Sequence, residues 1–399
     1  MDAEKFGYQY YRQVFSKTSK PFAFIDLDLF DANAAALKQR AGNKAIRIAS
    51  KSIRCQMLMS RLLASDPQFQ GVMSFHPEEA TYLSRQGFDD ILLGYPIYDK
   101  RYIRAIAEHV SEGKKIIFMV DDVNQLEQIN RVGAALEVEL PVCLDIDMSS
   151  RYPFLHFGVL RSRLQKTEDV LSIYQAIEKS RYVFLDGIMG YEAQIAGLAD
   201  NVPGQFLKSQ VIRFLKSRSC KEVADRRARI IGALAEHGAT PRFINGGGTG
   251  SLETTASEDV VTEVAVGSGF FSSALFDHYR QFKHHPAAGF AVEIVRKSSD
   301  GIFTCLGGGY VASGQPGKDR LPQPYLPESF QLTTNEAAGE VQTPIIYHGK
   351  ESLDFGDPVF FRHSKAGELC ERFNQLHLVR EGKLVGEVPT YRGEGLCFI

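Results

Sequence analysis

The sequence predicts an α/β protein in which a (β/α)8 TIM-type barrel is followed by a C-terminal, mainly antiparallel β domain. From residue 21 to about residue 273, short apolar runs alternate regularly with amphipathic stretches, which is typical of repeated β/α units. Eight such runs in about 230 residues fit a closed barrel better than an open sheet. From about Pro286 onward, β-rich runs are separated by Gly, Pro and Asp, and helical periodicity nearly disappears.

The eight expected barrel strands share a short apolar run with turn or helix signals on both sides. They are Ala45–Ala49, Gly71–Ser74, Asp90–Gly94, Lys115–Val120, Leu140–Asp145, Tyr182–Gly187, Arg242–Asn245 and Glu263–Val266. The helix between the second and third strands has clear limits. His76-Pro77-Glu78-Glu79 places proline and acids in a first turn, and Gly87 follows the last periodic residue.

The expected strands of the second domain are shorter. They are Phe290–Val295, Ile302–Cys305, Val341–Ile346, Pro358–Phe361, Leu376–Arg380 and Lys383–Pro389. We expect Gly307–Gln323 and Pro322–Pro327 to be loops. We also expect the run Phe22–Ile25, which precedes the first barrel helix, to pair with this domain. The predicted organisation is therefore a lead-in (1–20), a barrel (21–280) and a β domain (281–399).

Composition excludes several classes of protein. With 46 basic and 48 acidic residues among 399, the net charge of −2 provides no field that would attract nucleic acid or anionic lipid. The longest apolar runs, such as Lys115–Val120, are far shorter than the roughly 20 residues that span a bilayer. The first 20 residues lack the apolar core of a secretion signal. Six cysteines without CxxC spacing indicate reduced, mostly buried thiols, so we expect a cytoplasmic protein with no nucleic-acid or membrane partner.

A lysine marks the end of the first barrel strand. Lys51 follows Ala45–Ala49 almost directly, and the active sites of such barrels lie at the carboxyl ends of their strands. An amine beside apolar walls there has a lowered pKa and becomes nucleophilic toward an aldehyde. The alternative is a surface lysine in a loop.

Glycine-rich loops follow the seventh and eighth strands. The segment Asn245–Ser251 has three consecutive glycines, which let backbone amides approach an anion, and Thr249 and Ser251 add hydroxyl donors. A second short run, Val266-Gly267-Ser268-Gly269, follows the eighth strand. These two loops are the usual phosphate position in such barrels, although a flexible turn is the alternative. Neither matches GxxxxGK[ST] or GxGxxG, which disfavours nucleotide binding of those kinds.

A strand-end lysine and a phosphate loop together describe a barrel that holds pyridoxal 5′-phosphate. On these residues the chain resembles the alanine-racemase-type pyridoxal-phosphate enzymes and, within them, the D-threonine aldolase and D-serine dehydratase family. The matching segments are PFAFIDLD at 21–28, Lys51 in IASKS, Gly187 and Tyr191 in LDGIMGYE, GGGTGS at 246–251, Glu263 and Gly267-Ser268 in TEVAVGSG, and His363 in GDPVFFRHSK.

The resemblance assigns roles to individual positions. It makes Lys51 the lysine that forms the Schiff base with the cofactor, and it places Tyr191 beside the cofactor ring as a second candidate catalytic side chain. Simple aromatic packing is the alternative for Tyr191. The resemblance also implies that the cofactor phosphate contacts Gly247, Gly248, Thr249, Gly250 and Ser268. His363 falls where the family carries a histidine that binds a divalent metal ion, manganese or zinc.

The metal-binding motif differs from that of the family. Metal-binding members have His-x-Cys or His-x-Asp, whereas here Ser364 and Lys365 follow His363. A protonated amine is not a metal ligand. Either Glu368 or Cys370 completes the site, or Lys365 takes the place of the metal.

Two further departures lie near the expected cofactor. The family usually has an arginine in an RxG sequence after the fifth strand, where this chain has His156-Phe157-Gly158 with Arg161 offset. The family's Gly-Ser-Tyr after the eighth strand is Gly267-Ser268-Gly269 here, which removes an aromatic ring.

The resemblance implies a pyridoxal-phosphate-dependent lyase acting on D-configured β-hydroxy amino acids, by retro-aldol cleavage or by dehydration and deamination. It also implies a homodimer, because the related fold builds its site between the barrel of one subunit and the β domain of another. An amino-acid racemase is an alternative. A non-catalytic pyridoxal-phosphate carrier is another, although the extra carboxyl-terminal domain argues against it.

Overall fold

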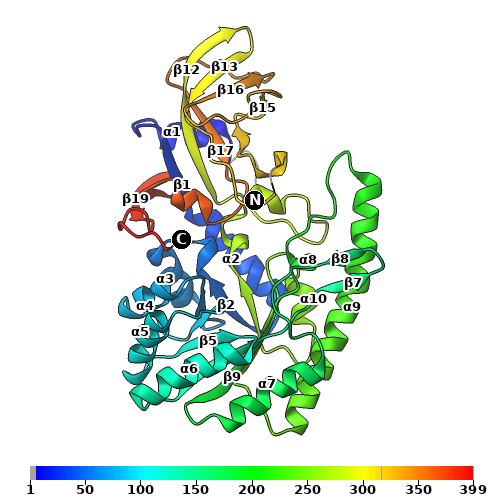
Figure 1. The fold of residues 1–399 in the computed structure, drawn as a ribbon. Coiled ribbons are helices and arrows are strands. Elements are labelled where there is room, and N and C mark those ends of the chain that lie inside the picture. Colours follow the sequence, from blue (N-terminus) through cyan, green and yellow to red (C-terminus); the bar gives the residue numbers. More distant parts are fainter. Residues whose placement is uncertain (1–5, 316, 399) are drawn as a thin grey trace. The chain divides into compact units, whose positions relative to one another are not determined.

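The structure is a computed structural model that describes residues 6–315 and 317–398. The chain forms two compact units (Figure 1). The barrel unit comprises Leu37–Lys51, Leu58–Gly267 and the carboxyl-terminal Phe398. The sheet unit comprises the residues up to Ala36, Ser52–Met57 and Ser268–Cys397.

A closed parallel barrel is the centre of the first unit. Its strands neighbour one another in the order β10-β11-β2-β3-β4-β5-β6-β9. Their bounds are β2 Ala45–Ala49, β3 Phe69–Ser74, β4 Ile91–Leu93, β5 Ile116–Val120, β6 Leu140–Asp145, β9 Val183–Gly190, β10 Phe243–Gly246 and β11 Glu263–Val266. Each corresponds to one predicted strand, so the barrel prediction is confirmed.

Helices follow most of these strands (Figure 1). They are α3 Gln56–Ser65, α4 Pro77–Arg85, α5 Lys100–Ser111, α6 Val123–Leu136, α7 Thr167–Lys179, α8 Ala193–Ala196, α9 Phe206–Glu236, α10 Leu252–Ala256 and α11 Ser268–Phe271. Helix α2 Leu27–Ala41 precedes β2. The predicted helix after β3 is confirmed as α4. The side chain of His76 caps it by accepting a hydrogen bond from the Glu78 amide, and Pro77 is its first residue.

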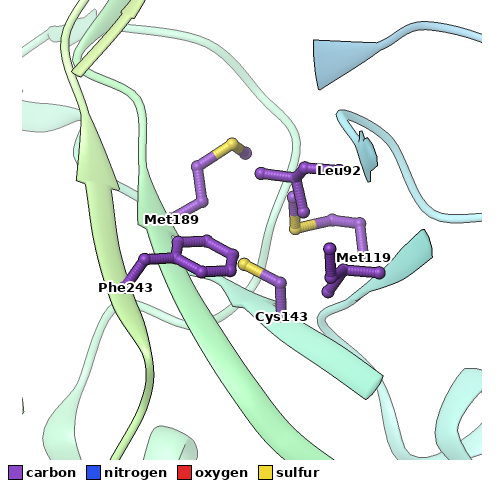
Figure 2. Close-up of a cluster of buried hydrophobic side chains, with 6 residues drawn as sticks. Leu92, Met119, Cys143, Met189 and Phe243 are labelled. Atoms are coloured by element: carbon purple, nitrogen blue, oxygen red, sulfur yellow. The ribbon is translucent and has the colours of Figure 1, made fainter. Parts of the chain in front are cut away.

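Apolar side chains fill the barrel interior. Figure 2 shows part of a buried cluster that joins strands on opposite sides of the barrel. Its members are Leu92, Ile117, Met119, Cys143, Met189 and Phe243, with Met73 packed against them. The unbranched methionine side chains adapt to the irregular gaps between the branched ones.

A charged cluster occupies the amino end of the barrel. Arg47 of β2 is fully buried, and its guanidinium pairs with Glu263 at 2.7 Å and with Asp90 at 3.2 Å. Asp90 also accepts a hydrogen bond from Arg242 at 2.9 Å, and Asn245 donates to Glu263 at 2.8 Å. Because Asp90 and Glu263 stand where β4 and β11 begin, this network ties strand starts together.

A nine-stranded sheet forms the second unit, together with α1 Tyr8–Val14. Its main path runs β15-β16-β13-β12-β1-β18-β19, and β17 pairs with β12 and with β14. The bounds are β1 Phe22–Asp26, β12 Ala288–Ser299, β13 Ile302–Leu306, β14 Gln323–Leu326, β15 Phe330–Leu332, β16 Gln342–Tyr347, β17 Pro358–Arg362, β18 Gln375–Arg380 and β19 Lys383–Pro389. The predicted pairing of the amino-terminal run is confirmed, because β1 is antiparallel to β12 and parallel to β18.

One sequence prediction about loops is wrong, and one hairpin was not predicted. Pro322–Pro327 contains strand β14, which pairs with β17 and with no other strand of the described residues. Proline lacks an amide hydrogen and is tolerated in a strand with one free edge, so the prolines concealed this strand. The segment after β6 also contains a hairpin, β7 Ser150–Tyr152 and β8 Leu155–Phe157, whose short strands carry no clear alternation.

Two general expectations can be compared with the described residues. Four of the six cysteines, Cys55, Cys143, Cys305 and Cys370, are buried. None of the helices in residues 6–315 and 317–398 combines the length and the apolar character needed to cross a bilayer.

Candidate active site

Lys51 lies in the short 3-10 helix η2 (Ser50–Ser52) at the carboxyl end of β2. Its side chain is exposed, and Nζ donates a hydrogen bond to the hydroxyl of Tyr95 at 2.7 Å. Tyr95 follows the end of β4. The guanidinium carbon of Arg161 lies 5.6 Å from the centre of the Tyr95 ring. These three side chains therefore gather at the barrel mouth although 44 and 66 residues separate Lys51 from Tyr95 and Tyr95 from Arg161.

The loop after β6 supplies this arginine from an unexpected position. His156 and Phe157 belong to β8, and the His156 Nε2 atom bonds to the carbonyl of Val159 at 3.2 Å. His156 thus makes a local contact next to the hairpin, and Arg161 follows a few residues later. The position that looked offset in the sequence is the one that reaches the partner of Lys51.

The glycine-rich loop begins where β10 ends at Gly246. Gly247 has a φ of +82°, a conformation that favours glycine. A Cβ atom on Gly248 would lie 2.9 Å from the Cβ of Ala196 and 3.2 Å from the Tyr191 ring. Gly247 and Gly250 are buried residues, and their amides find no hydrogen-bond acceptor among the residues that the structure describes. Since buried amides normally have partners, an anionic ligand suits this loop.

The hydroxyl of Ser251 has other partners than the sequence suggested. It accepts a hydrogen bond from the Gly248 amide at 3.1 Å and donates one to Glu192 at 2.6 Å. Ser251 therefore holds the loop in place by linking the Gly248 amide to Glu192. The loop is also held by Arg40, whose guanidinium donates to the Thr249 carbonyl at 2.6 Å.

Tyr191 follows the last residue of β9 and lies against Gly248. Burial, with a contribution from the Glu192 carboxylate, raises the pKa of Tyr191 to about 12. Its phenol is therefore neutral at physiological pH. The structure brings this predicted ring to the predicted phosphate loop.

Ser268 is the first residue of α11, two positions beyond the end of β11. Its hydroxyl oxygen lies 3.2 Å from that of Ser52. Ser268 belongs to the sheet unit, whereas Gly247, Gly248, Thr249 and Gly250 belong to the barrel unit.

A model of one protein family covers most of this barrel. The model of the alanine racemase N-terminal domain matches residues 25–273. The chain belongs to this family. Among curated relatives, 3-hydroxy-D-aspartate aldolase of Paracoccus denitrificans is 24% identical over 264 residues, which are 65% of this chain and 62% of the relative. The chain thus matches less than two thirds of that relative's length.

Solved structures share the fold of this alanine racemase N-terminal domain protein over nearly the whole chain. D-threonine aldolase from Filomicrobium marinum has a TM-score of 0.79 at 18% identity, covering 94% of this chain and 95% of that one. D-threo-3-hydroxyaspartate dehydratase from Delftia sp. HT23 has a TM-score of 0.74 at 18% identity, covering 94% and 98%. The resemblance stated from the sequence is confirmed.

His363 follows β17 in this member of the family and is buried. Burial, together with the neighbouring Arg362 charge, lowers the pKa of His363 to about 3, so its imidazole is neutral. Its ring packs edge-on against Phe271 at 6.1 Å, and neither ring nitrogen makes a hydrogen bond of good geometry within the described residues. A neutral imidazole can bind a metal ion, but one such ligand is not enough.

The other candidate ligands are engaged elsewhere in the sheet unit. Glu368 accepts a hydrogen bond from the Ser313 amide at 2.9 Å, and Lys365 donates to the Ser313 hydroxyl at 2.9 Å. The Cys370 thiol is buried and donates to the Ile53 carbonyl at 3.2 Å. Among residues 6–315 and 317–398, no group of three or more His, Cys, Asp and Glu side chains could hold a metal ion.

Sequence reasoning missed Tyr95, Glu192 and the role of Arg161. Tyr95 had a usable signal, because it follows the end of a predicted strand at the barrel mouth. Glu192 stands next to the predicted Tyr191, but its contacts depend on residues 59 and 63 positions away. Nothing in the local pattern identifies such contacts.

Proposed function

We propose that this protein is a pyridoxal-phosphate-dependent lyase that acts on D-configured β-hydroxy amino acids. The observation that carries the proposal is the glycine-rich loop with two amides suited to an anion, at the end of β10, together with the amine of Lys51 at the end of β2. Only β11 separates these strands, and neighbouring strands lie about 4.8 Å apart, so the two ends are roughly 10 Å apart. The aldolase and dehydratase relatives support the choice of substrate.

The residues at the barrel mouth fit the cofactor. Gly247 and Gly250 would bind the phosphate through their amides, Gly248 leaves room for its close approach, and Lys51 supplies the amine for covalent attachment. Thr249 and Ser268 are the further proposed phosphate contacts. When bound, pyridoxal phosphate supplies an electron sink that stabilises negative charge at the substrate Cα.

The protein's own residues then decide which bond breaks. The Lys51 amine would be the group that moves a proton at the substrate Cα. Tyr95 orients the Lys51 amine through their hydrogen bond, and Arg161 adds a positive charge beside that pair. The neutral Tyr191 ring borders the phosphate loop and orients the cofactor. Retro-aldol cleavage requires a base at the β-hydroxyl, whereas dehydration requires loss of the Cα proton and of the hydroxyl.

We infer that the reaction does not depend on a manganese or zinc ion at His363. The inference rests on the donor set, because Glu368, Lys365 and Cys370 are all engaged with other groups in the sheet unit. The measurement is lyase activity after chelator treatment, which we expect to be retained. Activity that chelation abolishes and manganese or zinc restores would contradict the inference.

We further propose that the protein is a homodimer and acts in the cytoplasm. The dimer follows from the family's construction of its site from two subunits, and light scattering of the active protein measures it. A fully active monomer would contradict the proposed assembly.

The central experiment combines attachment and turnover. The purified protein, reconstituted with pyridoxal phosphate, should be yellow, and borohydride should fix the cofactor to Lys51, as read by peptide mass mapping. Incubation with D-threonine, D-3-hydroxyaspartate and D-serine should release glycine if the protein is an aldolase and a 2-oxo acid if it is a dehydratase. Attachment at another lysine overturns the site, stereochemical inversion alone indicates a racemase, and binding without turnover of any amino acid indicates a carrier.

A further inference from the structure

A buried ionic network lies behind the glycine-rich loop. Arg227 of α9 and Glu192, just after β9, are each 1% exposed. The Arg227 Nη2 atom donates to Glu192 Oε2 at 3.0 Å and to the Gly190 carbonyl at 2.9 Å. The other carboxylate oxygen of Glu192 accepts hydrogen bonds from the hydroxyls of Ser251 and Thr255, both at 2.6 Å. Both oxygens of this carboxylate thus have partners: Arg227 on one, and the hydroxyls of Ser251 and Thr255 on the other.

The network reaches the loop backbone through one atom. The Ser251 hydroxyl, which donates to Glu192, accepts the amide hydrogen of Gly248 at 3.1 Å. A serine hydroxyl has one hydrogen to donate, so its donation to Glu192 leaves only lone pairs facing Gly248. The direction of the Gly248 amide therefore depends on Glu192, and the amides of Gly247 and Gly250 are covalently tied to the same turn.

The charges in this network are unusual beside an anion site. Glu192 and Glu258 both pair with the single guanidinium of Arg227. Removing the cation that pairs with a buried carboxylate strongly destabilises the folded protein. The uncompensated carboxylate would also repel a nearby phosphate. Arg227 therefore makes the carboxylate compatible with an anionic ligand a few residues away.

We propose that Glu192 and Arg227 are positioning residues for the phosphate loop: Glu192 fixes the turn through Ser251 and Thr255, and Arg227 neutralises Glu192. This inference rests on the proposed function, since it concerns the phosphate of the proposed cofactor. Neither residue needs to touch the cofactor for this role.

The test compares two aldehydes that differ only in the phosphate. Cofactor-free protein is titrated with pyridoxal 5′-phosphate and with pyridoxal, and absorbance reports each dissociation constant. We expect Arg227→Met to raise the dissociation constant of pyridoxal phosphate by about 100-fold, which is within the cost of breaking a buried ion pair. The dissociation constant of pyridoxal should change by less than about 3-fold. Ser251→Ala is a milder variant, because it removes only the link between Gly248 and Glu192. It should raise the dissociation constant of pyridoxal phosphate by about 10-fold.

The double variant Glu192→Gln/Arg227→Met separates charge from shape. Glutamine keeps an oxygen for Ser251 and Thr255 but carries no charge, so the part of the loss that Glu192 causes in Arg227→Met should be recovered, while Glu258 still lacks its guanidinium partner. Arg47→Met is the matched control, because Arg47 is equally buried among carboxylates at the other end of the barrel. It should lower the unfolding midpoint without changing the ratio of the two dissociation constants, and the partly exposed Arg242→Met is a milder version of that control.

The outcomes separate this inference from the proposed function. Wild-type protein that binds neither aldehyde contradicts the proposed function itself. Wild-type protein that prefers pyridoxal phosphate, with Ser251→Ala and Arg227→Met weakening both aldehydes equally or neither, overturns the positioning role alone. A double variant no better than Arg227→Met would show that charge neutralisation is not what Arg227 contributes, and would overturn that half of the inference.

Discussion

The two ends of the barrel each bury an arginine among carboxylates, but the two clusters face different neighbours. At the amino end, Arg47 pairs with Asp90 and Glu263. At the carboxyl end, Arg227 pairs with Glu192, whose other oxygen faces the hydroxyls of the glycine-rich loop. The first network links the starts of strands and stabilises the barrel. The second reaches, through Ser251, the backbone of a loop that is suited to a ligand.

Carboxyl groups at the two ends also differ in pKa. Burial alone would raise the pKa of Asp90, but Arg47 and Arg242 outweigh it and lower that pKa. At the other end, burial and the neighbouring Asp121 raise the pKa of Asp145 to about 7, and Arg161 offsets this only in part. The amino end is thus neutralised internally, while the mouth retains charge that is costly to bury. Barrel enzymes generally keep stability at the first end and chemistry at the second.

The strongest test of this division is Lys51→Ala. Lyase activity should fall by at least about 10³-fold, because both the attachment of the cofactor and a proton-moving group are lost. Stability should change by no more than about 0.5 kcal/mol, since the Lys51 side chain is exposed. Activity assays and urea unfolding measure the two effects, with the exposed Lys100→Ala as control. A large loss of stability would mean that the mouth also holds the fold together.

A second change adds a side chain to the glycine-rich loop, the proposed phosphate site. Gly248→Val places atoms within 2.9 Å of Ala196 and 3.2 Å of the Tyr191 ring, so the loop must move. We expect the dissociation constant of pyridoxal phosphate to rise by about 100-fold, because the displaced loop no longer directs its amides at the phosphate. Gly232→Val on α9 is the matched control, because a Cβ there meets nothing within 4 Å. Unchanged affinity in Gly248→Val would reduce the loop to a turn.

Local features and long-range contacts differ in how well the sequence predicts them. All eight barrel strands, Lys51 and the glycines at 246–250 are visible locally, because apolar runs and glycine clusters act over a few residues. Strand β14 was hidden by its prolines. The contacts of Tyr95 with Lys51, and of Arg227 with Glu192, join residues 44 and 35 positions apart, and only closure of the barrel brings them together. Local pattern therefore identifies the candidate ligand loops, while the contacts that orient them can be found only from the fold.

A smaller effect is expected at the partner of Lys51. Tyr95→Phe removes the hydroxyl that accepts the Lys51 hydrogen bond and keeps the ring beside Arg161. Loss of a hydrogen bond to a charged group costs about 1.5 kcal/mol or more, so kcat should fall by about 10-fold. The affinity for pyridoxal phosphate should stay within about 3-fold, since the phosphate loop is untouched. Tyr98→Phe, an exposed tyrosine three residues further on, is the control. Equal loss of kcat in both variants would argue against an orienting role for Tyr95.

The smallest expected effect concerns Asp145 and depends on pH. The folded-state pKa of about 7 lies above the ordinary carboxyl value of 3.8, so folding favours the protonated form. The stability that this group contributes is therefore fully present at acidic pH and is lost as the pH rises through 7. Asparagine is neutral at every pH, so Asp145→Asn should raise the urea midpoint more at pH 8 than at pH 5.

Asp90→Asn provides the opposite case for Asp145→Asn. The lowered pKa of Asp90 means that its ionised form stabilises the fold at neutral pH, and that this contribution fades as the pH falls through the lowered pKa. Its removal leaves the charge of the buried Arg47 partly uncompensated, so Asp90→Asn should lower the urea midpoint at both pH 5 and pH 8. If both variants shift the midpoint in the same direction at pH 8, the electrostatic contrast between the two ends of the barrel is wrong. Opposite shifts of the two urea midpoints would mean that ionised Asp145 at the mouth destabilises the fold, whereas ionised Asp90 at the amino end stabilises it.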